Sequence, residues 1–178
     1  MGGKKFSMSN LRLINSTSIT SSVSSLSLTD VFSSDFDVYK IIVRAECISG
    51  SATGTNIRFI NSSGNIVSDA KYDSALYGLR ASSSAFEIRT INGSSFVSIG
   101  NVYNEQGGGS VFYIFTPYNS NNYTYIIGEG SAFDSSGRSY RSLGGFTQDL
   151  SFTGIDFQFV DANVDEGVFR VFGYRVDS

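Results

Sequence analysis

The feature that most constrains this chain is a series of short apolar runs in which apolar and polar residues alternate. In the clearest run, residues 39–48, the side chains that would share one buried face are those of Tyr39, Ile41, Val43, Ala45 and Cys47. Such alternation is typical of a β-strand, because successive side chains point to opposite faces of a sheet. Gly, Asn, Ser and Asp separate the runs, which is the turn chemistry of an all-β protein.

The same pattern predicts about ten strands in all. The other predicted segments are residues 11–14, 26–32, 56–60, 86–91, 96–102, 110–116, 123–127, 151–160 and 167–176. Strands at this spacing indicate an all-β fold, an antiparallel two-layer β-sandwich of jelly-roll type. We expect residues 1–25 to form an N-terminal arm, or docking segment, with the first strand, and residues 26–178 to form the sandwich domain.

Local signals refine this prediction. Asn61 to Asn65 and Asn92-Gly93 supply residues that tolerate positive φ, as tight turns require, and Pro117 directly follows a predicted strand. Residues 72–79 allow two interpretations. Tyr72, Leu76 and Leu79 have helical spacing, whereas Gly78 and the serines behind it disfavour a helix.

The amino-acid composition excludes several classes of catalytic and metal-binding site. The chain has no His and one Cys, so His-dependent nucleophilic catalysis, His-ligated metal sites and Cys-pair motifs are excluded. We therefore expect no enzyme and no cofactor, although a carboxylate-based glycan hydrolase stays as a minor alternative. The net charge of −3 argues against nucleic acid as a partner, and no segment has the apolar length for membrane insertion. Cys47 has apolar neighbours and is predicted to be a buried core residue.

One acidic segment resembles the start of a calcium loop, because Asp161, Asn163 and Asp165 alternate as oxygen ligands do. The pattern then fails, since Glu166 stands where such a loop needs Gly and Phe172 stands where it needs a bidentate acid. We predict a solvated hairpin turn between the last two strands and no metal site.

Two tyrosine-containing stretches are candidate interaction sites. The first contains Tyr118, Asn121, Tyr123 and Tyr125, and the second contains Tyr140 between Arg138 and Arg141 in a Gly/Ser-rich loop. Exposed tyrosines beside amides or guanidinium groups can contact a sugar or a protein. The alternative interpretation is that these tyrosines merely line the face of a strand.

Three segments resemble small β-sandwich modules of tailed-bacteriophage virion proteins, of the head-decoration (cement) and tail-fibre or tip types found in cyanophages and other marine phages. The first segment is Leu26 to Arg44, which has a Phe, a short turn and Asp-Val-Tyr before a strand. The second is Ile114 to Thr124, which contains Thr-Pro and Tyr-Thr. The third combines Phe152 to Phe157 with Gly167 to Tyr174 and resembles a closing hairpin whose last strand ends in aromatic-Gly.

The resemblance spans residues 26–178 and implies a non-enzymatic virion component, synthesised in the host cytoplasm and commonly a homotrimer. Its partners would be other virion proteins, such as the major capsid protein or components of the tail or portal. The short segment before the module favours a self-contained accessory protein of the head or tail. The alternative function is a receptor-binding or carbohydrate-binding module of a tail fibre or tip, with a host glycan as partner.

Overall fold

The structure is a computed structural model that describes residues 10–47, 53–96, 101–102, 107–133 and 137–175. Its elements are β1 (Leu11–Ile19), β2 (Ser25–Leu28), β3 (Val38–Glu46), β4 (Thr53–Asn61), β5 (Tyr72–Arg80), β6 (Ser83–Gly93), β7 (Asn101–Val102), β8 (Gly108–Phe115), β9 (Thr124–Phe133), β10 (Gly137–Phe146), β11 (Phe152–Phe159) and β12 (Glu166–Tyr174). All strand pairs are antiparallel. In these residues no helix is long and apolar enough to cross a membrane.

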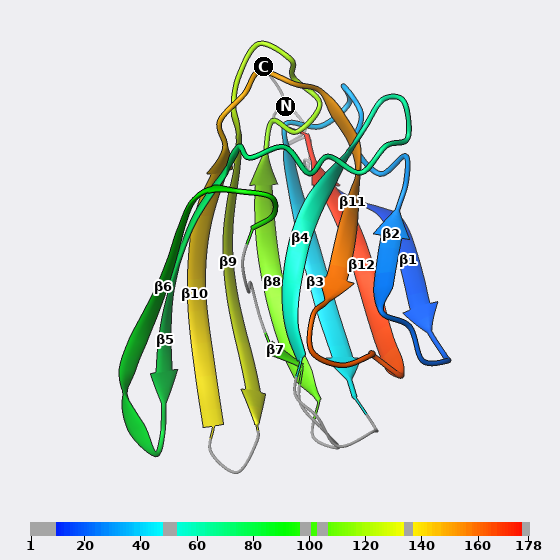
Figure 1. Ribbon diagram of the computed structural model, residues 1–178. Coiled ribbons are helices and arrows are strands. Elements are labelled where there is room, and N and C mark those ends of the chain that lie inside the picture. Colours follow the sequence, from blue (N-terminus) through cyan, green and yellow to red (C-terminus); the bar gives the residue numbers. More distant parts are fainter. Residues whose placement is uncertain (1–9, 48–52, 97–100, 103–106, 134–136, 176–178) are drawn as a thin grey trace, which may run out of the picture.

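Eight of the strands form a jelly roll. β1 pairs with β12, β2 with β11, β3 with β8, and β4 with β7, so early strands pair with late ones. These pairs form two facing sheets, β1-β12-β3-β8 and β2-β11-β4-β7. Figure 1 shows β4 and β11 in front of β3 and β12. The predicted all-β, antiparallel, two-layer sandwich is therefore confirmed.

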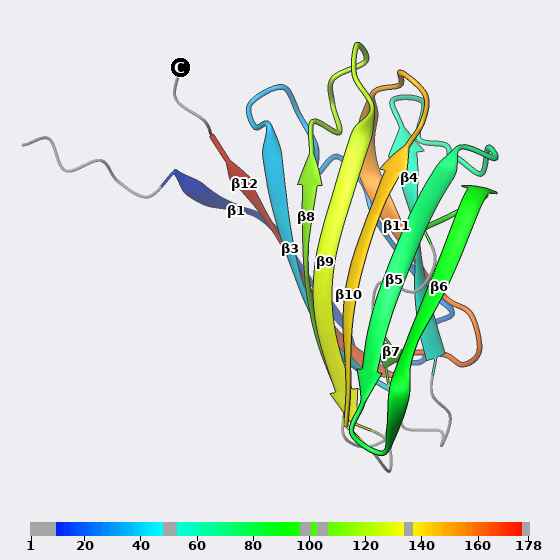
Figure 2. The same ribbon diagram turned by 90° about the vertical axis from the view of Figure 1, so that its left-hand side faces the viewer.

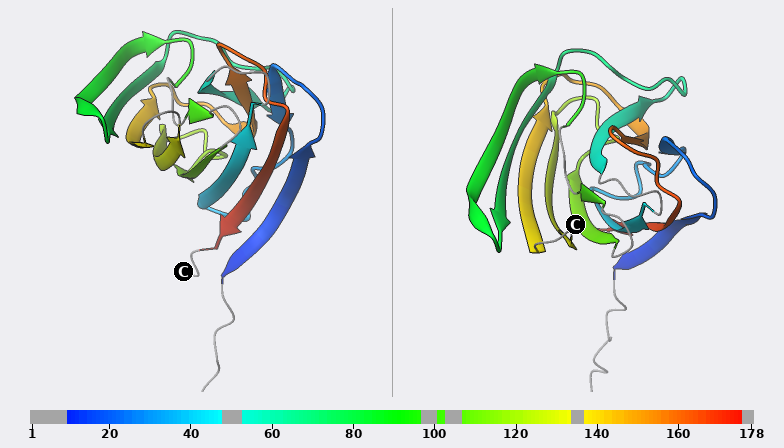
Figure 3. Two further views of the ribbon diagram at one scale, coloured as in Figure 1. Left: turned by 90° about the horizontal axis from the view of Figure 1, so that it is seen from below. Right: turned by 60° about the horizontal axis from the view of Figure 1, so that its bottom comes forward.

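The other four strands extend only one of the two sheets. β5 and β6 form a hairpin in the connection from β4 to β7, while β9 and β10 form a hairpin in the connection from β8 to β11. The two hairpins pair through β10 and β5, which gives the larger sheet the order β1-β12-β3-β8-β9-β10-β5-β6. We call β5, β6, β9 and β10 the wing. In Figure 3 it extends past the smaller sheet on the β5–β6 side.

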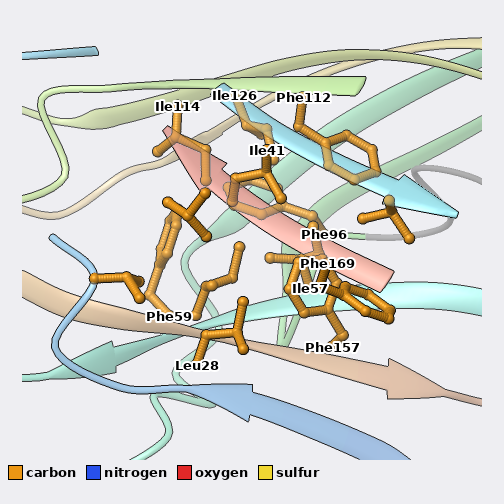
Figure 4. Packing of buried hydrophobic residues seen from close by; sticks show 14 of the residues in the cluster. Leu28, Ile41, Ile57, Phe59, Phe96, Phe112, Ile114, Ile126, Phe157 and Phe169 are labelled. Atoms are coloured by element: carbon orange, nitrogen blue, oxygen red, sulfur yellow. The ribbon is translucent and has the colours of Figure 1, made fainter. Parts of the chain in front are cut away.

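The core lies between the two sheets. The predicted face of β3 is confirmed, because Tyr39, Ile41, Val43, Ala45 and Cys47 are all buried. Figure 4 shows rings from the smaller sheet, Phe59 and Phe157, pointing toward side chains of the larger one. Burying side chains of this size stabilises the sandwich by roughly 1.5–3 kcal/mol each.

The helical interpretation of residues 72–79 is wrong, because this segment is the strand β5. β5 pairs with β10 along one edge and with β6 along the other, so its backbone is hydrogen-bonded from both sides. Tyr72 and Leu76 are buried on the inner face, whereas Leu79 is exposed on the outer face. Long-range pairing thus overrides the local helical spacing.

Several boundaries also differ from the predictions. β10 was not predicted as a strand, and residues 20–24 separate β1 from the short β2. The positive φ expected near Asn61 to Asn65 and at Asn92 is confirmed at Gly64 (78°) and at Asn92 (54°). Pro117 follows β8 as predicted. Parts of three predicted strands, residues 48, 97–100 and 176, lie outside the described residues.

Candidate functional site

The two faces of the larger sheet differ in what covers them. Its inner face packs on the smaller sheet, which lies on one side only in Figure 2. Its outer face is therefore expected to be polar, as in most antiparallel sheets with one face exposed to water. The strand register shows instead that two adjacent rows of this face are mostly apolar.

The two rows cross six strands, from β1 to β10. The register aligns one row as Leu11, Tyr174, Val38, Phe115, Tyr125 and Gly145, and the next as Leu13, Phe172, Lys40, Tyr113, Ile127 and Leu143. We call these residues the outer band. Leu13, Tyr125, Ile127 and Leu143 are 50%, 52%, 46% and 61% exposed. Its one charged group, the Lys40 ammonium, lies 5.8 Å from the centre of the Tyr113 ring.

The size of the outer band follows from the spacing of the strands. With strands ~4.8 Å apart, six strands span about 24 Å, and two rows with their margins cover roughly 15 Å along the strands. The outer band therefore covers on the order of 350 Å² in projection. A contiguous apolar patch of this size is comparable to the largest patch on a typical monomer, and such patches are often functional.

Below the outer band, the outer face contains a hollow of about 540 Å³ over β8, β9, β10 and β5. We call it the outer groove. The register aligns Gly109, Ser131 and Ser139 in its floor, ending at Leu79 on β5. The row above it contains Glu129, Arg141 and Tyr77, side by side on β9, β10 and β5. Arg141 Nε lies 3.5 Å from the Glu129 carboxylate, and both side chains are exposed.

The first predicted interaction stretch is divided between two places. Tyr118, Asn121 and Tyr123 are exposed in the connection between β8 and β9, at the top of Figure 1. The backbone N–H of Asn121 donates to Asn119 Oδ1 at 2.9 Å, and Ser151 Oγ donates to the Tyr118 carbonyl at 2.8 Å. Tyr125 lies beyond this connection, in the outer band on β9.

The second predicted stretch is not a loop, and this expectation is corrected. Arg138, Tyr140 and Arg141 all belong to the strand β10, so alternate residues face opposite sides. Tyr140 is buried on the inner face, where its ring meets Phe86 edge-on at 6.0 Å, and Arg138 lies half-buried on the same face. Arg141 is on the outer face and lines the outer groove.

The acidic segment connects the two sheets. The predicted hairpin is wrong, because β11 belongs to the smaller sheet and β12 to the larger, and the two do not pair. The Asp161 carboxylate accepts from the Gly54 amide at 3.4 Å, and the Asn163 side-chain amide donates to Ser22 Oγ at 3.1 Å. Among the described residues, no three His, Cys, Asp or Glu side chains come together as a metal site would require.

Cys47 is buried as predicted, with no exposed surface. Burial raises the pKa of its thiol to about 11, and the nearby Asp165 carboxylate adds to the rise. The thiol is therefore protonated at neutral pH, which suits a core residue and not a nucleophile.

Sequence reasoning missed Tyr77, Leu79, Glu129, Ser131 and Ser139 as surface residues of one site. The usable signal was the alternation within residues 72–80 and 124–133, which places Tyr77, Leu79 and Glu129 opposite buried neighbours once both segments are strands. Which strands lie next to one another depends on the long-range pairing of β10 with β5, and no local pattern encodes that pairing.

Comparisons with known proteins find matches only among solved structures. No protein-family model matches the chain, and no curated protein matches it. Among solved structures, the chain is similar to the CBM2 module of the evolved Dit of Lactobacillus casei BL23 phage J-1, with 10% identity, a TM-score of 0.20, and coverage of 86% of this chain and 70% of that one.

The chain is also similar to the structure of infectious bursal disease virus strain Gx, with 12% identity and a TM-score of 0.16 over 94% of this chain and 41% of that one. The VP2 subviral particle of the same virus gives 11% identity and a TM-score of 0.16 over 94% and 40%. The neighbours are weak matches to phage and viral proteins.

Proposed function

We propose that this protein is a non-enzymatic structural component of a tailed-bacteriophage virion, which assembles by burying its outer band against further copies of itself. The single observation that carries the proposal is the outer band, two apolar rows on the open face of the larger sheet. The assignment to a tailed-bacteriophage virion rests on the resemblance of residues 26–178 to phage β-sandwich modules.

The composition of the outer band supports copies of the same chain as the occupant. Interfaces between permanently associated subunits are more apolar than other protein surfaces, and their centres are depleted in charged residues. The outer band contains five aromatic rings, those of Tyr113, Phe115, Tyr125, Phe172 and Tyr174, on β8, β9 and β12. Lys40 is its one charge, and its ammonium lies 5.8 Å from the centre of the Tyr113 ring, whose negative face attracts it.

The experiment that tests the proposal is mass spectrometry of purified phage particles, with the wild-type gene compared with an Ile127→Lys, Leu143→Lys double variant. Both positions are exposed, so the substitutions add charge to the outer band and leave the core intact. Wild-type chains are expected in the particle, and the double variant is expected to be depleted at least about tenfold, which corresponds to ~1.4 kcal/mol of lost affinity.

The control is Ser139→Lys, which adds one lysine on β10 outside the outer band. It is expected to enter particles as the wild type does. Absence of the wild-type chain from purified particles, or equal depletion of the control, contradicts the proposal.

A further inference from the structure

The outer groove lies beside the outer band and has a different chemistry. Its floor is formed by residues with small or no side chains, Gly109 on β8, Ser131 on β9 and Ser139 on β10. On a sheet face that otherwise carries larger side chains, this row leaves a trough that runs across the strands. Its volume of about 540 Å³ is in the range of small-ligand sites, ~300–1,000 Å³.

The groove offers both apolar and hydrogen-bonding groups at its surface. Tyr77 and Leu79 on β5 are 54% and 51% exposed, so a ring and an aliphatic side chain are available to the C–H faces of a ligand. The hydroxyls of Ser131 and Ser139 can each donate and accept hydrogen bonds. The Glu129 and Arg141 side chains, 72% and 81% exposed, add a strong acceptor and a strong donor.

A second hollow of about 340 Å³ lies on the other side of Tyr77 and Arg141. It is lined by Ala75 on β5 and by the Glu87–Arg89 ion pair on β6, in which the nitrogen and oxygen are 2.9 Å apart. Tyr77 and Arg141 line both hollows, so one extended ligand could pass over them and occupy both.

The charges around the two hollows balance. Glu129 pairs with Arg141 and Glu87 pairs with Arg89, so two carboxylates face two guanidinium groups. An anionic ligand would be attracted by the arginines and repelled by the glutamates to a similar extent. A cationic ligand would be attracted by the glutamates and repelled by the arginines. A neutral ligand rich in hydroxyl groups matches this surface better than a charged one.

We propose that the outer groove binds a neutral oligosaccharide, with a sugar ring stacked on Tyr77 and its hydroxyls hydrogen-bonded to Glu129, Arg141 and the groove serines. This function is separate from assembly through the outer band, because Tyr77 and Leu79 lie outside the two apolar rows. The sugar-binding surface is therefore on the wing and not on the Tyr118 to Tyr123 connection.

The test is NMR titration of the full chain with single neutral hexasaccharides, namely cellohexaose, maltohexaose and mannohexaose, and with an acidic galacturonic hexasaccharide. At least one neutral sugar is expected to bind with a Kd of about 1 mM or tighter, as expected for an open site on a sheet. Tyr77→Ala is expected to weaken that binding about tenfold, because stacking of a sugar ring is lost. The matched control Tyr118→Ala, which removes another exposed tyrosine, is expected to leave the Kd unchanged.

A second variant keeps the test decisive if Tyr77→Ala does not fold. Ser131→Phe places a ring in the groove floor from an exposed position and is expected to abolish binding. Three results would each overturn the proposal: no response to any neutral hexasaccharide, tighter binding of the acidic one, or equal loss in Tyr118→Ala. The Ile127→Lys single variant changes an outer-band residue that lines neither hollow and is expected to bind sugar normally, which separates failure of this site from failure of assembly.

Discussion

The jelly roll and the wing are parts of one structure, but they are stabilised differently. β3 and β11, in the jelly roll, have buried side chains at about every second position or more. The wing contributes Tyr72, Ile126 and Phe146 to the same core, but no residue of its edge strand β6 is buried. The wing strands are nevertheless paired along their lengths, through β9 with β10, β10 with β5 and β5 with β6. The jelly roll therefore packs on the core along most of its strands, whereas the wing packs on it through β5, β9 and β10 and leaves its edge strand and its outer face to carry contact residues.

The largest expected effect is on the core of the jelly roll. Phe59 is fully buried, and its ring centre lies 4.5 Å from that of Phe152 and 5.6 Å from that of Phe96. Phe59→Ala is expected to lower the free energy of unfolding by about 3–5 kcal/mol in urea denaturation, because it removes these contacts and leaves a cavity. Tyr77→Ala, in the wing, is expected to change it by less than about 0.5 kcal/mol. Similar losses of unfolding free energy in both variants would contradict the claim that packing contributes more at Phe59 than at Tyr77.

Two glycines offer a second comparison, with a smaller effect. A Cβ at Gly154, in the jelly roll, would lie 2.5 Å from the Leu28 carbonyl oxygen, which belongs to the backbone of the paired strand. We expect Gly154→Ala to cost about 1–3 kcal/mol in the same assay, because backbone must shift.

At Gly78, in the wing, the added Cβ would meet the Phe86 ring at 2.2 Å. Phe86 is half-buried on the edge strand and can turn away, so Gly78→Ala is expected to cost less than about 1 kcal/mol. A larger loss for Gly78→Ala than for Gly154→Ala would show that packing holds the wing as tightly as the jelly roll.

Alkaline pH tests the core that the two regions share, because the groups whose pKa rises are buried there, Tyr39 and Cys47 in the jelly roll and Tyr72 on the wing strand β5. Burial raises the pKa of the Cys47 thiol from 9.0 to about 11, and burial also raises the pKa of Tyr72 and of Tyr39. A thiol that ionises more readily in the unfolded chain stabilises the fold fully below pH 9.0 and progressively less as the pH rises to about 11.

We therefore expect the free energy of unfolding to be flat to about pH 8–9 and then to fall, as followed by urea denaturation at successive pH values. Cys47→Ala is expected to lower stability at neutral pH and to make the decline between pH 9.0 and about 11 shallower. An unchanged slope in this variant would mean that the thiol is not the group responsible.

The fold class could be predicted from the sequence because the jelly-roll strands carry their own signal. Buried strands such as β3 alternate strongly, and turn residues such as Gly64, after β4, mark their ends. The wing strand β10 contains Gly, Ser and Arg at most positions, so its alternation is weak, and β5 has helical spacing. Pairing between these two segments decides their structure, and the paired residues are 58 positions apart in the chain at Arg138 and Arg80 and 74 apart at Phe146 and Tyr72.

The candidate site was less predictable for the same reason. Tyr118, Asn121 and Tyr123 were recognised as exposed because a polar connection can be read locally. The outer groove needs Tyr77 to lie beside Arg141 and Glu129, and this depends on the strand order β9-β10-β5. The outer band likewise becomes visible only after six strands are placed in register.

The central claim is that the outer band is a contact surface between copies of this chain, and light scattering coupled to size exclusion at micromolar concentration tests it most directly. The wild type is expected to elute as an oligomer of the 19.2 kDa chain, with three copies as the resemblance implies, and Ser139→Lys is expected to behave in the same way. The folded Ile127→Lys, Leu143→Lys variant is expected to have the mass of one chain. A monomeric wild type, or a double variant that keeps the wild-type mass, would contradict the account.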